Sequence, residues 1–150
     1  MTRVDFYVLD DQAEAARERF ACRLVEKAFR LKHKVYLHAA SAAAAQRLDA
    51  LLWSFSESSF IPHVLATADL DPSLADATPV QIGTADAPGF DAAVLVNLDG
   101  VVPGFFSRFE RVAEIVGGGA PERTQARERF KFYRDRGYVL ETHRIGSAGT

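Results

Sequence analysis

The first third of the chain alternates between two kinds of apolar pattern. Residues 4–9 form an almost continuous apolar run with β-branched and aromatic side chains, which is typical of a buried strand. A stripe at helical spacing follows, and a second short apolar run at 35–38 leads into another helical stripe that ends at Trp53. This strand–helix–strand–helix order predicts a single α/β domain over residues 1–150, with a mostly parallel sheet, right-handed crossovers and helices on both faces.

The turn after the first strand bears on nucleotide binding. The first helix is expected to begin with a capping box, in which Asp11 is the N-cap and Glu14 lies three residues later. The turn contains no glycine, and the earliest glycine in the chain is Gly83. A dinucleotide site needs glycines here, because the backbone must approach the pyrophosphate. The sequence thus predicts a three-layer, Rossmann-like fold that lacks the glycine-rich nucleotide loop, and no cofactor is expected.

The rest of the chain continues the α/β pattern less regularly. Further strands are predicted at 64–66, 80–82, 93–98 and 138–141. Residues 69–76 are expected to form a flexible acidic loop, and a short helix is expected after Pro103. Residues 112–116 fit both strand and helix spacing, and the strand is favoured. A basic helix is predicted to start at Pro121 and to end at Gly137 as its C′ residue.

Charge is distributed unevenly along the chain. The formal net charge is −2, which disfavours a general nucleic-acid binder. Residues 121–137, however, include six basic and three acidic residues, which gives this segment a charge of +3. The rest of the chain therefore carries −5. An acidic body with one basic helix indicates a specific anionic partner, with DNA contacted only weakly or indirectly.

Other features exclude whole classes of protein. The single cysteine, Cys22, rules out an intramolecular disulfide, and its apolar helix face predicts a core position. Residues 2–6 lack a signal peptide's features, and no apolar run approaches the roughly 20 residues of a membrane span, so a cytoplasmic protein without membrane contact is expected. The four histidines show no metal-binding spacing, and no nucleophile elbow is present. A non-catalytic protein is therefore favoured, and a small nucleotide- or metabolite-binding α/β enzyme is the alternative.

An aromatic cluster is predicted to lie outside the core. On the second helix Trp53 shares a face with Gln46 and Asp49, and the apolar stripe of Leu48 and Leu52 lies on another face. The apolar residues that follow in a serine-rich segment are Phe55, Phe60, Ile61 and Pro62. A second buried face is hard to build from such a segment. An exposed apolar cluster with a polar rim usually marks a partner surface.

The basic helix admits two interpretations. Its apolar row of Ala126, Phe130 and Tyr133 is expected to face the sheet, so its arginines are either a solvated face or part of a site. Arg127 lies at the edge of this row, which puts a guanidinium beside an apolar floor. That combination suits a peptide carboxylate attached to an aromatic residue. Arg123, one turn earlier, is treated as a surface charge outside such a site.

Three segments, in this order, resemble the chi subunit of bacterial DNA polymerase III, a clamp-loader accessory protein. They are Phe6-Tyr7-Val8-Leu9-Asp10, then Arg47-Leu48-Asp49 through Trp53 with Phe60-Ile61-Pro62-His63, and finally residues 126–134. The resemblance spans nearly the whole chain. It implies a non-catalytic subunit that bridges the clamp loader, through the psi subunit, to the C-terminal tail of single-stranded DNA-binding protein.

The resemblance also implies two sets of site residues. The psi interface matches Trp53, Phe60 and Pro62, and the pocket for the tail of single-stranded DNA-binding protein matches Val116, Arg127 and Phe130. Relatives commonly carry a tyrosine where this chain has Phe130, so a hydroxyl contact is absent here. The Gly117-Gly118-Gly119 run also departs from the family's more rigid loop beside the pocket.

Overall fold

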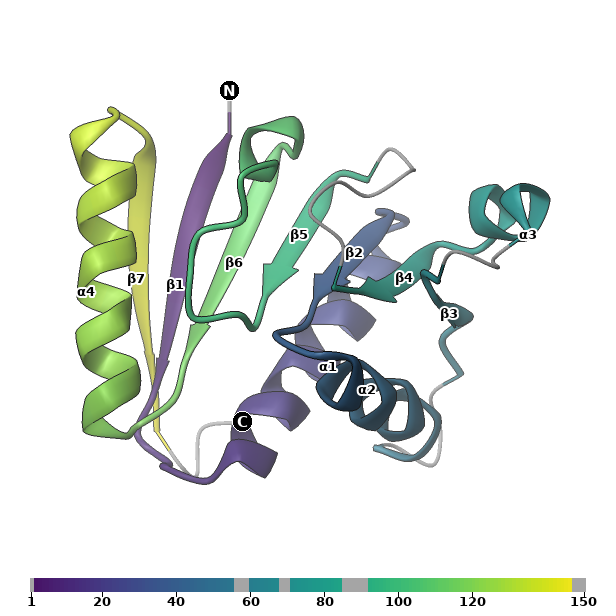
Figure 1. Cartoon of the computed structure of the whole chain (residues 1–150), viewed down its shortest axis with the longest axis horizontal. Coiled ribbons are helices and arrows are strands. Elements are labelled where there is room, and N and C mark those ends of the chain that lie inside the picture. The colour runs from purple at the N-terminus through teal and green to yellow at the C-terminus, as the bar shows by residue number, and fades with distance from the viewer. Residues whose placement is uncertain (1, 56–59, 68–70, 85–91, 147–150) are drawn as a thin grey trace.

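The computed structural model describes residues 2–55, 60–67, 71–84 and 92–146 (Figure 1). Seven strands form one sheet in the order β3-β4-β2-β5-β6-β1-β7, and every pairing is parallel. The strands are β1 (Arg3–Leu9), β2 (Val35–His38), β3 (His63–Leu65), β4 (Val80–Gly83), β5 (Val94–Asn97), β6 (Arg111–Val116) and β7 (Val139–Ile145). The helices are α1 (Glu14–Arg30), α2 (Ala42–Ser54), α3 (Pro72–Ala77) and α4 (Ala120–Asp135), with a short 3-10 helix at Phe106–Arg108. The predicted α/β class is confirmed.

Helices cover both faces of the sheet and form two apolar cores. On one face, α1 and α2 pack on the central strands, with Cys22, Val25 and Leu48 fully buried. On the other face, α4 and the phenylalanine-rich segment before β6 pack on β1, β5 and β6. Figure 1 shows α4 alongside β7, at the opposite end of the sheet from β3 and β4. The predicted core position of Cys22 is thus confirmed.

The loops after β1 and β6 contact each other at the carboxyl edge of the sheet. The Gly118 amide donates a hydrogen bond to the Asp11 carbonyl oxygen at 2.9 Å. A Cβ on Gly118 would collide with the Asp10 carbonyl oxygen, so this close approach requires glycine. In dinucleotide-binding folds the ligand lies in such a crevice at the carboxyl edge. In this protein the backbone of Gly118 lies between the loops after β1 and β6, at the carboxyl edge of the sheet.

Two predictions about local structure are wrong. Helix α1 begins at Glu14 with Ala13 at the N-cap position, and no side chain caps it. The Asp11 carboxylate instead accepts a hydrogen bond from the Ala13 amide at 2.9 Å, a local turn that ends before the helix begins, so no capping box forms. The predicted loop at 69–76 contains helix α3, whose start is supported by a 2.8 Å hydrogen bond from the Ser73 amide to the Asp71 carboxylate.

Several other elements agree with the sequence patterns. Ser41 caps α2 through a 3.1 Å hydrogen bond from the Ala44 amide. Residues 111–116 form strand β6, as favoured, and Gly137 has a positive φ of 80° after α4. The last strand extends to Ile145, four residues beyond its predicted end, because β7 pairs with the full length of β1.

Candidate protein-interaction sites

An aromatic patch lies at the end of α2, where the chain enters β3. We define the aromatic patch as Trp53, Phe60 and Pro62. Trp53 is 52% exposed and Phe60 is 67% exposed, although their ring centroids lie only 5.4 Å apart. Pro62, half-buried, follows two residues after Phe60. The prediction that Trp53 lies outside the core is confirmed.

The aromatic patch rests on a fixed histidine. The His63 ring lies 4.3 Å from the Trp53 ring, and the His63 side chain is fully buried. Its Nδ1 lies 2.6 Å from the Ile61 carbonyl oxygen and its Nε2 lies 3.0 Å from the Asp49 carbonyl oxygen. Because α2 supplies both Asp49 and Trp53, the indole is supported from its own helix. No spacing in the sequence indicates this supporting role of His63, because Asp49 and Trp53 lie on another element.

The serine-rich segment also contributes to the core. Ile61 is only 1% exposed and belongs to the core of the α1 face, and Phe55 is half-buried against the same core. The expectation that a second buried face is hard to build here is therefore wrong for Ile61. The alternation of Phe60 outward and Ile61 inward follows from the extended backbone that leads into β3. Residues 56–59 lie outside the described residues.

A second site lies between α4 and the carboxyl halves of three strands. This cavity, the α4 pocket, has a volume of about 190 Å³. Val116, Arg127 and Phe130, predicted from the family resemblance, all line it. Its floor also includes Val8 and Phe6, whose ring centroid lies 5.4 Å from that of Phe130. Residues from β1, β6 and α4 thus converge on one apolar floor with an exposed arginine at its edge.

The α4 pocket carries positive charge from three elements. Arg123 and Arg127 come from successive turns of α4, and Arg144 comes from the edge strand β7. No acidic side chain lines the pocket among the described residues. Arg123 donates from Nη2 to the Leu9 carbonyl oxygen at 3.4 Å, which holds it in the wall of the pocket. The expectation that Arg123 lies outside the site is therefore wrong, because one helical turn brings it beside Arg127.

A buried polar network fixes α4 on the sheet. Arg129 donates from Nε to Glu114 Oε1 at 2.9 Å, and Tyr133 donates from its hydroxyl to Glu114 Oε2 at 2.6 Å. Asn97 Nδ2 adds a hydrogen bond of 3.0 Å to the same carboxylate. Burial raises the pKa of Glu114, and the charge of Arg129 together with these hydrogen bonds opposes that rise. Arg129 is only 5% exposed, so the interpretation of all arginines of this helix as a solvated face is wrong.

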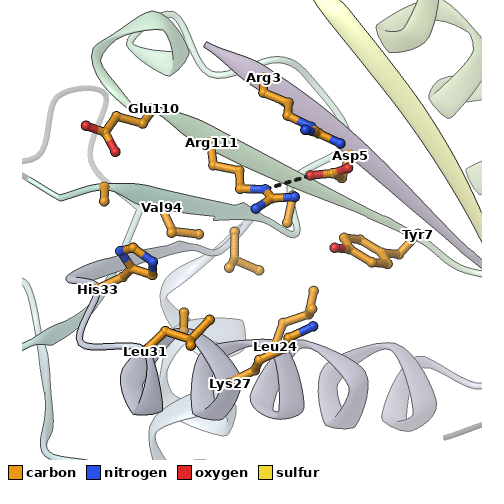
Figure 2. Close-up of a pocket in the computed structure, with 14 residues that line it drawn as sticks. Arg3, Asp5, Tyr7, Leu24, Lys27, Leu31, His33, Val94, Glu110 and Arg111 are labelled. Atoms are coloured by element: carbon orange, nitrogen blue, oxygen red, sulfur yellow. Dashed lines mark hydrogen bonds and ion pairs between the residues drawn. The ribbon is translucent and has the colours of Figure 1, made fainter. Parts of the chain in front are cut away.

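A further cavity lies on the α1 face, at the amino ends of β1, β5 and β6. It has a volume of about 330 Å³. In Figure 2, Leu24 and Lys27 of α1 and Leu31 just after it lie on one side, and Arg111 reaches Asp5 on the other. The Arg111 Nε–Asp5 Oδ2 distance is 2.9 Å. Because its charged lining is of mixed sign and partly paired, this cavity selects neither an anion nor a cation.

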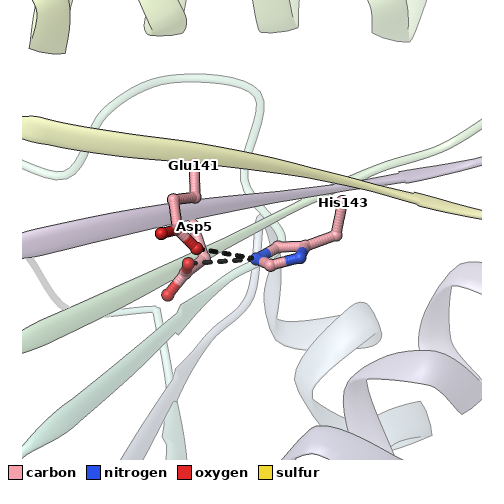
Figure 3. Close-up of side chains that lie close together, drawn as sticks. All are labelled: Asp5, Glu141 and His143. Carbon is pink, nitrogen blue, oxygen red and sulfur yellow. Dashed lines mark hydrogen bonds and ion pairs between the residues drawn. The ribbon is translucent and has the colours of Figure 1, made fainter.

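One group of potential metal ligands adjoins this cavity. Asp5, Glu141 and His143 place ligand atoms within 4.8 Å of one another (Figure 3). Sequence spacing did not indicate this group, because Asp5 and His143 are 138 residues apart. Both carboxylates already bind guanidinium groups, Glu141 with Arg3 at 2.7 Å and Asp5 with Arg111. The group is therefore an ion-pair network on the sheet surface, where two fixed cations disfavour a metal ion.

The fold and its exposed apolar sites define a three-layer parallel α/β protein with two candidate protein-binding surfaces. None of the helices in the described part of the chain has the length and apolar character needed to cross a membrane. The chain belongs to the DNA polymerase III chi subunit family, because the family model described as "DNA polymerase III chi subunit, HolC" matches residues 1–141.

Curated relatives agree over nearly their whole length. The DNA polymerase III subunit chi of Pseudomonas aeruginosa is 46% identical over 145 residues, which cover 97% of this chain and 98% of the relative. The chi subunit of Haemophilus influenzae is 31% identical over 143 residues, covering 94% and 96%. That of Escherichia coli is 28% identical over 147 residues, covering 95% and 97%. The family resemblance predicted from sequence is confirmed, and the chain is an accessory subunit in DNA replication.

Solved structures of low sequence identity share the fold. The crystal structure of T4 UvsW matches 97% of this chain with a TM-score of 0.69 and 8% identity. A Saccharomyces cerevisiae Dbp5 variant bound to a Gle1 variant and IP6 matches 97% with a TM-score of 0.61 and 17% identity. The chain spans 42% of the length of each of these structures. At such identities the likeness concerns the fold alone.

Proposed function

We propose that this chain is a non-catalytic, cytoplasmic adaptor of the DNA polymerase III holoenzyme. Its aromatic patch binds the psi subunit of the clamp loader, and its α4 pocket binds the C-terminal tail of single-stranded DNA-binding protein. The observation that carries the proposal is the convergence of Val116, Arg127 and Phe130 on one pocket. Val116 of β6 and Phe130 of α4 contribute an apolar floor, and Arg127 contributes a cationic rim, which is what an acidic peptide with an apolar C-terminal residue requires.

The psi half of the proposal is supported by the exposure of the aromatic patch. Trp53 and Phe60 are large, exposed and in contact with each other, and the buried His63 ring holds the indole in place. A pre-organised aromatic anchor loses little entropy when it binds, and Trp is enriched among the residues that dominate binding energy. The two surfaces involve different parts of the fold, α2 with the segment before β3 for one and α4 with β1, β6 and β7 for the other.

The test of the α4 pocket compares two charge reversals on one helix. Arg127→Glu should weaken binding of a short acidic peptide ending in phenylalanine by about 2 kcal/mol or more, measured by isothermal titration calorimetry. Lys131→Glu is the matched control, because Lys131 is exposed on α4, outside the pocket lining, and the change in net charge is the same. Lys131→Glu should leave the affinity nearly unchanged. Equal losses from both variants would show a diffuse basic surface instead of a pocket.

The test of the aromatic patch uses truncations of equally exposed side chains. Trp53→Ala should abolish measurable association with the psi subunit in gel filtration, since buried tryptophan anchors typically contribute about 2 kcal/mol or more. Leu74→Ala is the control, because Leu74 on α3 is 51% exposed, close to the 52% of Trp53. Unchanged association of Trp53→Ala, or an equal loss for Leu74→Ala, would contradict the proposed interface.

A further inference from the structure

Several arginines that have no acidic partner in the described part of the chain line two neighbouring cavities. Among the described residues, several exposed arginines pair with a carboxylate, as Arg30 does with Glu26 at 3.3 Å. Within the described ranges, the side chains of Arg127 and Arg144 in the α4 pocket have no hydrogen bond or ion pair, and the Arg123 side chain donates only to a backbone carbonyl. Its Nε is buried and has no hydrogen-bond partner in the described structure. Unpaired guanidinium groups around an apolar floor favour an anionic ligand.

The second cavity lies across the sheet from the α4 pocket. This strand-end pocket has a volume of about 280 Å³ and lies between α1 and the ends of β1 and β7. Its apolar lining includes Leu9, Phe20 and Ile145. Arg19 and Arg23, one turn apart on α1, line it as well, and the side chain of neither has a hydrogen bond or ion pair in the described structure. The strand-end pocket thus repeats the α4 pocket's chemistry on the other face.

The two pockets meet at the carboxyl ends of the same two strands. Val8 and Arg144 line the α4 pocket, and the next residue of each strand, Leu9 and Ile145, lines the strand-end pocket. This follows from the alternation of side chains along a strand. Strand β7 is the edge of the sheet, so no strand formed by the described residues separates the two faces beyond it. An extended chain can therefore pass around the end of β7 from one pocket to the other.

The charges at this edge favour an acidic chain. Five arginines, at positions 19, 23, 123, 127 and 144, line the two pockets. The acidic residues facing them are Asp11, which lines the strand-end pocket, and its neighbour Asp10. One oxygen of Asp11 is already bonded to the Ala13 amide. The balance of the two pockets is therefore positive, although the whole chain has a net charge of −2.

We infer that one extended acidic peptide occupies both pockets. Its C-terminal residue lies in the α4 pocket, and its preceding acidic residues pass around the end of β7 to Arg19 and Arg23. The inference rests on the proposed function, because it extends the binding site of the same tail. It assigns to α1 a part in selecting acidic sequence upstream of the terminal residue. Arg144 lies at the crossing point and contributes to both segments of the peptide.

The experiment compares a short and a long peptide on the full chain. The short peptide has about four residues and ends in phenylalanine, and the long one has about ten, with acidic residues upstream, and spans at most about 35 Å when extended. A third peptide matches the long one but carries amides in place of the upstream acids. Fluorescence anisotropy gives the affinity of each for the wild type, for the double variant Arg19→Glu with Arg23→Glu, and for Arg127→Glu.

The double variant should lower the affinity for the long acidic peptide roughly threefold to thirtyfold, because it reverses the charge of two exposed arginines. It should leave the affinity for the short peptide unchanged. In the wild type, the long acidic peptide should bind more tightly than both the short and the amide peptide. Arg127→Glu should weaken all three peptides. The matched control, Arg30→Glu with Lys32→Glu, makes the same charge change at the far end of α1 and should leave every affinity unchanged. Circular dichroism establishes that each variant is folded.

Distinct results overturn the inference and the proposed function. If the short peptide binds and the double variant leaves the long peptide unaffected, the strand-end pocket takes no part and the inference fails alone. If Arg30→Glu with Lys32→Glu weakens binding of the long peptide equally, the effect is one of long-range charge, and the inference is also overturned. If the double variant instead reduces binding only of a single-stranded oligonucleotide, the edge is a nucleic-acid surface and the inference is wrong. If the short peptide fails to bind the wild type, the proposed function itself fails.

Discussion

Arg129 donates a hydrogen bond from Nε to Glu114 Oε1 at 2.9 Å, and both side chains lie in the core between α4 and β6. Arg129 also donates from Nη1 to the Gly100 carbonyl oxygen at 3.1 Å. The pair thus joins the helix, the central sheet and the loop after β5. Arg127, two residues earlier, lines the α4 pocket on the same helix. The position of the candidate binding arginine therefore depends on a buried ion pair that fixes α4.

Removal of Arg129 should destabilise the protein in a pH-dependent way. Arg129→Leu should cost about 3–5 kcal/mol of unfolding free energy near neutral pH, because it leaves a buried carboxylate without its counter-ion. Burial already raises the pKa of Glu114, and loss of the arginine removes the charge that opposes this rise. A carboxyl whose pKa is higher in the folded state holds its proton more strongly there. The stability that the folded state gains from this tighter proton binding is fully present below the unfolded pKa of about 4.3. It is lost as the pH rises toward the folded pKa.

Urea unfolding of Arg129→Leu at about pH 5 and pH 8 checks this sign. The loss of unfolding free energy in Arg129→Leu, relative to the wild type, should be larger at the higher pH. Adding Glu114→Gln should flatten the pH dependence, because the amide does not titrate. Arg134→Leu serves as the control, since Arg134 is exposed and pairs only with its neighbour Asp135. A loss of unfolding free energy that is larger at low pH would contradict the role of Arg129 as the counter-ion of Glu114.

Strand and helix order was predictable from periodicity, and the buried ion pair was not. The runs at β1 and β2 and the stripe of Leu48 and Leu52 identify buried faces directly, because burial imposes the spacing. Arg129 lies among exposed basic residues of α4, and its partner Glu114 belongs to a strand whose register with α4 depends on tertiary packing. No local pattern distinguishes a buried arginine from its neighbours. The only sequence signal was an acidic residue in the middle of a buried strand.

The candidate sites were predictable to different degrees. Helix geometry alone placed Trp53 outside the core, because its neighbours one turn away are polar. The α4 pocket needed the family resemblance to name Val116, Arg127 and Phe130, since the residues of β6 and α4 meet only in the folded chain. The strand-end pocket and Arg144 had no sequence signal at all. Their position depends on strand order, and the order of a parallel sheet is set by crossovers that periodicity does not encode.

Gly118 should be intolerant of a side chain. Gly118→Ala places a methyl group against the Asp10 carbonyl oxygen, so the loops after β1 and β6 must separate. The expected loss of unfolding free energy is about 1–3 kcal/mol, as for overpacking elsewhere in proteins. Gly104→Ala is the matched control, because a Cβ at Gly104 meets no atom within 4 Å. Thermal unfolding should show a lower melting temperature for Gly118→Ala only. Equal melting temperatures for both variants would contradict the tight loop contact.

Cys22 should be unreactive while the protein is folded. Burial, with a smaller contribution from Glu18, raises the pKa of the Cys22 thiol to about 12. At pH 8 the thiolate, which is the reactive form, is therefore scarce, and the sulfur is also shielded from solvent. A chromogenic disulfide reagent should react orders of magnitude more slowly with the native chain than with the chain in denaturant. Rapid reaction of the native chain would show that α1 opens locally or that Cys22 lies outside the core.

Trp53 provides a direct optical probe of the aromatic patch, because it is the only tryptophan. Its side chain is half exposed, so the free protein should emit at long wavelength and be quenched efficiently by acrylamide. Binding of the psi subunit should shift the emission to the blue and reduce quenching, since an anchor residue is desolvated in an interface. Addition of an acidic peptide that binds at the α4 pocket should change neither property. A blue-shifted emission that resists quenching in the free protein would return Trp53 to the core, whereas a response to the acidic peptide alone would show that the two surfaces are coupled or overlap.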